Sequence, residues 1–393
     1  LVSIDPATGA VRALVGGPGA NFNQYDVMLG ERQPGSGFKL FTLLAALQQG
    51  YSVFDTVDSH SPCGIKFPGN ADLAKKPINN DDGPGGGTIS LVAATAGSVN
   101  CAYIRLAHEV GLPNVLAMAY QLGISQREVP PSTYDYIPSV VIGAAAVEPI
   151  EMAGAYATVA DNGVFHKPSF INYVNDRTGN QIYNGLNPGT RVFSPQVAAE
   201  ADVALRAVVT GGTGTAASLY NRPVAGKTGT TSNNVDAWFN GFTPQLETTV
   251  WMGNFKSDNV PIYIPGFGYV YGANFPAHTW HDYSAIVLAN DPVLPLPGVV
   301  PGLLPPTRFI TSLALVADDV LDHNGGGYSQ CSGSNYSYGY YNGCPTYTYG
   351  GPTTPTTSGV NTPPTTRPTK HPPKTTPPTT AASPATTAVP ATG

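Results

Sequence analysis

The chain has 393 residues, 41% of them hydrophobic, which is enough for one large domain or two smaller ones. Its net charge is -6, and setting aside the three positive charges of the Pro- and Thr-rich residues 345–393 leaves about -9 on the rest. A chain with this charge and no cluster of Lys and Arg is not expected to bind nucleic acid.

The first elements predicted along the chain are a hairpin, a helix and a long loop. Residues 2–4 and 11–15 form two strand patterns around a turn, without a signal peptide or transmembrane pattern, so the chain is interpreted as a fragment or a mature piece. Residues 37–49 have the apolar spacing of a buried helix that ends at Gly50. Residues 51–88 are rich in Gly, Pro, Asn and Asp and are predicted to form an irregular surface excursion, a kind of loop that is often functional.

The middle of the chain is predicted to be helical, and the part after it is predicted to contain strands. A helical pattern covers residues 90–110, with Ser90 as its N-cap. Further helical patterns cover residues 113–122, 149–160 and 194–211. Strand patterns follow at residues 223–230, 236–242 and 248–252. This order favours an α+β fold in which the chain returns to complete its first sheet.

The C-terminal quarter is predicted to lack a large core. Residues 293–310 are broken by Pro and are predicted to be a linker, 311–344 a small Tyr- and Gly-rich segment, and 345–393 a disordered tail. Cys331 and Cys344 bracket a stretch without hydrophobic periodicity, which predicts a disulfide in an oxidising compartment, with two free thiols as the alternative.

No metal or cofactor is predicted. Cys63 and Cys101 are interpreted as either buried thiols or a second disulfide. Neither cysteine pair has the close spacing of a zinc site, and the seven histidines form no ligand or triad pattern. The tyrosines of residues 328–349 are interpreted as part of a structural loop or as a surface that stacks on glycan.

Ser36 and Lys39 are the candidate nucleophile and base. They are three residues apart at the start of a helix, so their side chains share one face, and the helix N-terminus favours a developing negative charge. Lys39 lies in an apolar helix, where desolvation disfavours the ammonium and a neutral lysine can act as a base. Ser-x-x-Lys alone is a weak signal, because such a spacing arises by chance in many chains.

Two further motifs strengthen the assignment. Ser98 and Asn100 fall in a helical region of small residues and offer a hydroxyl for proton relay and an amide that can bind a lysine. The strand with Lys227-Thr228-Gly229-Thr230 offers a lysine and two hydroxyls for a carboxylate, and its glycine lets a peptide backbone approach.

The three motifs in this order resemble the transpeptidase domain of bifunctional class A penicillin-binding proteins. The resemblance also rests on Arg32-Gln33-Pro34-Gly35-Ser36 and on residues 148–157, 211–216 and 236–239. It covers about residues 1–290 and implies a transpeptidase domain at 1–292, in which an antiparallel sheet packs against helices as in β-lactamases.

This resemblance implies a D,D-transpeptidase that cross-links peptidoglycan. Ser36 would attack the penultimate D-Ala of a stem peptide, and an amine of a neighbouring stem, on lysine or diaminopimelate, would resolve the acyl-enzyme. The backbone N-H groups of Ser36 and Thr230 would form the oxyanion hole, Lys227, Thr228 and Thr230 would hold the donor carboxylate, and β-lactams would acylate Ser36.

The resemblance further implies a parent protein that is anchored in the membrane, carries an N-terminal glycosyltransferase domain and works on the extracytoplasmic side at the cell wall. The chain departs from the family pattern at Val99, the middle residue of the second motif, and at Gly37, where a small polar residue is commoner. Two alternatives remain: a D,D-carboxypeptidase or β-lactamase-like hydrolase, in which water takes the acyl group, and a non-catalytic β-lactam sensor.

Overall fold

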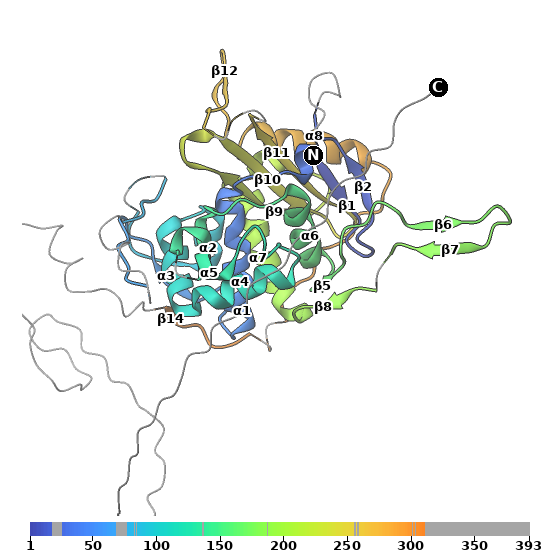
Figure 1. Ribbon diagram of the computed structural model, residues 1–393. Helices are drawn as coiled ribbons and strands as arrows, with labels where there is room; N and C mark the ends of the chain where they lie inside the picture. The colour runs from blue at the N-terminus through green and yellow to red at the C-terminus, as the bar shows by residue number, and fades with distance from the viewer. Residues whose placement is uncertain are drawn as a thin grey trace, which may run out of the picture. The chain divides into compact units, whose positions relative to one another are not determined.

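A five-stranded antiparallel sheet forms the centre of the fold in the computed structural model (Figure 1). The structure describes residues 1–310 except 18–25, 68–76, 82, 84, 136, 187, 255, 256, 258, 301 and 303. The strands are β1 (Val2–Ile4), β2 (Val11–Leu14), β9 (Ala225–Thr230), β10 (Asp236–Phe242) and β11 (Glu247–Gly253). Their order across the sheet is β2-β1-β11-β10-β9, so the chain does return to its first sheet, as the sequence predicts.

Hydrophobic clusters bury both faces of this sheet. Trp238 belongs to the larger cluster, together with apolar side chains of the helices on that face. Its neighbour Phe239 points to the other face and packs edge-to-face on Trp280, with ring centroids 5.7 Å apart. Trp280 lies on α8, whereas α6 and α7 cover the face of the larger cluster (Figure 1). The fold is therefore the α+β arrangement of an antiparallel sheet between helices.

Eight α-helices are present in the described part of the chain. They are α1 (Lys39–Gln48), α2 (Leu91–Ala96), α3 (Asn100–Val110), α4 (Leu112–Gln121), α5 (Pro131–Tyr134), α6 (Pro149–Ala160), α7 (Pro195–Gly211) and α8 (Phe275–Val287). Ser90 and Ser194 cap α2 and α7, their hydroxyls accepting from Ala93 N and Val197 N. Helix α1 contacts α3, α4 and α7, and its residues 39–47 are all buried. A helix enclosed on every side is expected to be mostly apolar, which explains why the residues from Leu40 to Leu47 are apolar apart from Thr42.

Short 3-10 helices and small strand pairs complete the described regular structure. The 3-10 helices are η1 (Val27–Leu29), η2 (Gly35–Phe38), η4 (Pro138–Ile142), η5 (Thr215–Ala217) and η6 (Ser232–Asn234). The further strands are β3 (Thr56–Asp58), β4 (Thr88–Ser90), β5 (Val164–Phe165), β6 (Tyr173–Asn175), β7 (Gln181–Asn184), β8 (Thr190–Arg191), β12 (Tyr263–Ile264), β13 (Gly268–Tyr269) and β14 (Phe309–Ile310). Most of these strands have only two or three residues, too few for a recognisable period of two in the sequence.

The predicted helix over residues 90–110 is wrong in one respect, because it is two helices. Gly97 ends α2, and Ser98 has a left-handed backbone with φ 55°. The carbonyl of Ala96 accepts from Thr213 N at 3.0 Å instead of continuing a helical ladder. The second motif therefore lies in a turn, with Asn100 at the first position of α3.

The predicted irregular excursion also contains regular structure. Its ends form β3 and β4, and its inner part is held by a disulfide between Cys63 and Cys101, whose Cα atoms are 5.5 Å apart. Of the two alternatives for these cysteines, the disulfide is therefore correct. In the predicted linker, Phe309–Ile310 forms β14, which pairs in parallel with β3 and buries Ile310.

The remaining predictions for the C-terminal part lie outside the described residues. These are the segment 311–344, the tail 345–393 and the disulfide between Cys331 and Cys344. Within the described ranges, no helix is both long and apolar enough to cross a bilayer.

Candidate active site

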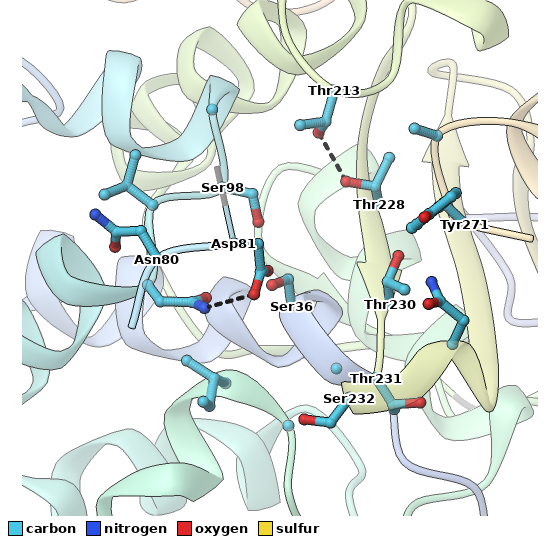
Figure 2. Close-up of a pocket in the computed structure, with 18 of the residues that line it drawn as sticks. Ser36, Asn80, Asp81, Ser98, Thr213, Thr228, Thr230, Thr231, Ser232 and Tyr271 are labelled. Carbon is cyan, nitrogen blue, oxygen red and sulfur yellow. Dashed lines mark hydrogen bonds between the residues drawn. The ribbon is translucent and has the colours of Figure 1, made fainter. Parts of the chain in front are cut away.

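A cavity of about 770 Å³ opens above the start of α1 (Figure 2). Its walls come from η2, the turn between α2 and α3, strand β9 and the loop before β4. Five of the eight residues predicted for the site line it: Ser36, Ser98, Asn100, Thr228 and Thr230. The two lysines, Lys39 and Lys227, are buried, with 0% and 1% of their surface exposed. This volume is typical of a ligand pocket.

Ser36 is held on a short, rigid turn. It lies in η2 with 8% of its surface exposed, where the sequence predicts the first turn of an α-helix. Hydrogen bonds fix the turn on both sides, from Trp238 Nε1 to Gln33 O at 2.7 Å and from the Tyr156 hydroxyl to Gly37 O at 3.0 Å. The hydroxyl of Ser36 thus has a fixed position at the edge of the cavity.

Lys39 Nζ is the centre of a buried hydrogen-bond network. It lies 2.9 Å from Ser36 Oγ, 2.6 Å from Asn100 Oδ1 and 2.6 Å from the backbone oxygen of Ser98. The last two atoms can only accept, and a neutral amine has two N-H groups to give them. Its lone pair is then left for the proton of Ser36, so this geometry suits a lysine base.

The orientation of the Asn100 amide is fixed from its other side. Asn100 Nδ2 donates to Asn79 O at 3.0 Å and to Asp81 Oδ1 at 3.4 Å, which places its oxygen toward Lys39. Sequence reasoning did not assign Asn79 or Asp81 to the site. The polar run Asn79-Asn80-Asp81-Asp82, in a loop of unusual length, was the signal that could have found them.

Ser98 lies between the two buried lysines. Its hydroxyl is 3.2 Å from Lys39 Nζ and 2.8 Å from Lys227 Nζ. Burial lowers the pKa of Lys227 from 10.5 to about 7, against the smaller effect of the Asp81 charge, which raises it. Ser36, Lys39, Ser98 and Lys227 therefore form a continuous hydrogen-bonded chain.

Backbones meet directly at the nucleophile because several glycines lie there. A Cβ at Gly35 would be 2.5 Å from Thr230 O, and one at Gly143 would be 2.1 Å from Gly35 O. On β9, a Cβ at Gly229 would be 2.2 Å from Pro34 O, so the glycine predicted for close backbone approach is where the sheet touches the nucleophile turn. These contacts place the backbone of Thr230 beside the residue that precedes Ser36.

The site has a serine hydroxyl within reach of a buried lysine, a bridging second serine, and a second lysine in contact with a threonine. These features define the class of serine acyl-transfer sites that use a lysine base. The comparisons with known proteins agree with this class. Residues 1–261 match the family model of the penicillin binding protein transpeptidase domain. The chain therefore belongs to the family of penicillin-binding protein transpeptidase domains.

Individual relatives show the same relationship. The chain is 34% identical over 307 residues to penicillin-binding protein 1A of Mycobacterium tuberculosis, covering 71% of this chain and 35% of the relative. It is 32% identical over 289 residues to penicillin-binding protein 1A of Aquifex aeolicus, covering 73% and 38%. The solved structure of the PonA1 protein from Mycobacterium tuberculosis in complex with penicillin V superposes with a TM-score of 0.66 at 30% identity, covering 76% of this chain and 80% of that one. The chain thus spans little more than a third of these curated relatives.

Proposed function

We propose that this chain is a D,D-transpeptidase domain that forms peptide cross-links in peptidoglycan through an acyl-enzyme on Ser36. The observation that carries the proposal is the 2.9 Å contact between Ser36 Oγ and Nζ of the fully buried Lys39. Lys39 takes the Ser36 proton as the hydroxyl attacks the carbonyl of the penultimate D-Ala. The proton reaches the leaving amine of the terminal D-Ala through Ser98, which lies within hydrogen-bond distance of both lysines.

The second half of the reaction reverses these roles. An amine of a neighbouring stem attacks the ester, the amide C-N bond forms, the bond between the acyl carbon and Ser36 Oγ breaks, and Ser36 recovers its proton through Lys39. We assign donor binding to Lys227, Thr228 and Thr230. The hydroxyls of the two threonines face one end of the cavity (Figure 2), and Lys227 Nζ lies 2.8 Å from the hydroxyl of Ser98 in the cavity wall. The backbone N-H groups of Ser36 and Thr230 are the proposed oxyanion hole.

Two observations support the cellular setting that we propose. The disulfide between Cys63 and Cys101 supports an oxidising compartment, so we place the domain on the extracytoplasmic side of the membrane. Relatives almost three times as long as the matched region support further segments in the parent protein, and we propose a glycosyltransferase domain and a membrane anchor among them.

Fluorescent penicillin tests the central assignment, since a relative in this family has been crystallised with penicillin V. Wild-type protein is expected to retain a covalent label on Ser36 through denaturing electrophoresis, and Ser36→Ala is expected to retain none. The matched control is Ser232→Ala, which removes another serine hydroxyl from the cavity wall without touching the Lys39 network. Equal labelling of Ser36→Ala and wild type would remove Ser36 from the nucleophile role.

The lifetime of the label separates the alternatives. A label that is lost within seconds would indicate a β-lactamase-like hydrolase. A lasting label on a protein that cannot process a D-Ala-D-Ala peptide would indicate a sensor. A lasting label together with transfer of the donor peptide to an amine is the result expected for a transpeptidase.

Acylation by a penicillin is expected to slow as the pH rises above about 7. Burial lowers the pKa of Lys227 to about 7, and only its ammonium form attracts the penicillin carboxylate. The measurement is the second-order rate constant of acylation, which reports the free enzyme, followed across the neutral range for a penicillin and its methyl ester. The ester has no carboxylate, so the ratio of the acid rate to the ester rate should fall.

The same shift in pKa predicts a dependence of stability on pH with the opposite direction. The folded pKa of Lys227 lies below its unfolded value of 10.5, so burying the ammonium costs stability below about pH 7. As the pH rises from about 7 toward 10.5, this cost disappears. The free energy of unfolding is therefore expected to increase over the same pH range. If the ratio of the acylation rate of the penicillin to that of its methyl ester stayed constant across pH 7, Lys227 would not titrate there.

A further inference from the structure

Asp81 carries the only carboxylate among the described residues that line the cavity. The other ionisable groups close to Ser36 are the buried lysines Lys39 and Lys227. Figure 2 shows Asp81 on the side of the cavity that carries Asn80 and Ser98, across from Thr228 and Thr230. The cavity therefore has hydroxyls on one wall and a negative charge on the facing wall, and the ammonium of Lys227 is buried in contact with Ser98.

The position of Asp81 is fixed by its neighbours. Asn80 donates from its backbone N to Ser61 Oγ at 3.0 Å and from Nδ2 to Ser59 O at 2.9 Å, and its Oδ1 accepts from Cys101 N at 2.9 Å. The disulfide from Cys101 to Cys63 ties the same loop to α3. Although Asp81 is exposed, its backbone is thus held next to Asn100, to which its carboxylate is also joined.

The reaction proposed above brings two ligands of opposite charge into this cavity. The donor ends in a carboxylate, and the acceptor amine arrives as an ammonium, because amines of this kind are protonated at neutral pH. An ammonium has three N-H donors and is attracted by a carboxylate. The donor carboxylate is assigned to Lys227, Thr228 and Thr230. The ammonium of Lys227 would repel the cationic acceptor, so Asp81 is the charged group that remains to bind it.

We propose that Asp81 and the adjoining cavity wall form the subsite that binds the cationic acceptor amine, an inference that rests on the proposed transpeptidase function. Aminolysis removes two protons from the ammonium: one passes to solvent, and the other passes through Lys39 to Ser36 Oγ as the ester C-O bond breaks and the amide C-N bond forms. Asp81 holds the ammonium beside the acyl-enzyme before this step and thereby favours the amine over water.

The test compares Asp81→Asn with wild type in the full chain. The donor is a labelled pentapeptide ending in D-Ala-D-Ala, and the acceptor probe is Nα-acetyl-lysine amide, which has one ammonium and no carboxylate. The KM for the acceptor is expected to rise about fivefold, the size of effect that a solvent-accessible charge pair supplies. The asparagine keeps an Oδ1 that can accept from Asn100 Nδ2. Loss of the Asp81 charge lowers the pKa of Lys227, so acylation is measured with the penicillin methyl ester, which has no carboxylate for Lys227 to attract, and is expected to change less than the acceptor KM.

The matched control is Asp282→Asn, which removes one exposed carboxylate from α8 on the far side of the sheet and should leave the acceptor KM unchanged. The ε-trimethylated probe, a cation that cannot react, should compete with the acceptor more weakly in Asp81→Asn than in wild type. The ε-acetylated probe, which is neutral, should compete equally in both.

Three results would overturn the inference. An unchanged acceptor KM would show that Asp81 does not bind the amine. Acylation by the methyl ester that slows by as much as the acceptor KM rises would show that Asp81 acts through Asn100. Slower hydrolysis of the acyl-enzyme without acceptor would show that it activates water. Equilibrium binding of the trimethylated probe to Ser36→Ala, with and without Asp81→Asn, tests the subsite even if no acyl-enzyme forms. Failure of the acceptor subsite can therefore be told apart from failure of the proposed transpeptidase function.

Discussion

Replacing Lys39 with alanine is expected to lower the rate of Ser36 acylation by about 10³-fold at neutral pH, within the range found when a general base is removed. Lys39 Nζ is the basic group in contact with Ser36 Oγ, and the backbone oxygen of Ser98 and Oδ1 of Asn100 are acceptors that orient it. The measurement is the time course of labelling with fluorescent penicillin. Melting curves of both proteins show whether the variant is still folded.

Lys39→Arg distinguishes a base from a positive charge. Arginine keeps the charge but holds its proton at every accessible pH, so it cannot accept the proton of Ser36. If Lys39 is the base, the arginine variant should be as slow as the alanine variant. Recovery of the wild-type rate in Lys39→Arg would mean that the site needs only a cation, and normal acylation of Lys39→Ala would remove Lys39 from the mechanism.

Gly143→Ala is expected to impair both stability and acylation. Gly143 follows η4 with φ 81°, where a Cβ costs about 1 to 2 kcal/mol, and that Cβ would lie 2.1 Å from Gly35 O. Relief of the collision has to move the backbone that carries Ser36, and a displacement of about 1 Å at a reacting group can cost about 100-fold in rate. We expect a loss of about 3 kcal/mol in the free energy of unfolding, measured by denaturant titration, and about 100-fold slower acylation.

Gly179→Ala is the matched control for this variant. Gly179 has φ 91° in the turn between β6 and β7, and a Cβ there would meet no atom within 4 Å. It should show the cost of the left-handed backbone alone, with normal acylation. Equal losses of stability in the two variants, with unchanged acylation in Gly143→Ala, would show that contact with Gly35 does not position the nucleophile.

Local patterns predicted the five strands of the central sheet, helices α1, α4, α6 and α7, and the meeting of Ser36 with Lys39, but they did not predict α5 or α8. The three-residue spacing gives the contact whether the turn is an α-helix or the 3-10 helix observed, since both place such residues on one side. The cap at Ser90 was also predicted, because capping depends on residues three positions away. Such features need no knowledge of distant segments.

Features that depend on tertiary contacts could not be predicted in the same way. The left-handed turn at Ser98 is stabilised by the distant Thr213, and the orientation of Asn100 by Asn79 and Asp81. The buried Glu247 is a further case. A glutamate at the start of a strand would be expected to face water, but β11 lies between β1 and β10, and burial there raises its pKa well above the ordinary value.

The position of β1 between β2 and β11 has a consequence for folding order. The hydroxyls of Ser3 and Thr248 meet at 2.7 Å although 245 residues separate them in the sequence. During synthesis the first hairpin therefore presents an unpaired strand edge, and the apolar α1 lacks its covering layers, until residues 225–253 have emerged. Contacts so distant in sequence slow folding. Ser36 is synthesised well before residues 225–253, yet it can enter its site only after the last strand of the central sheet is in place.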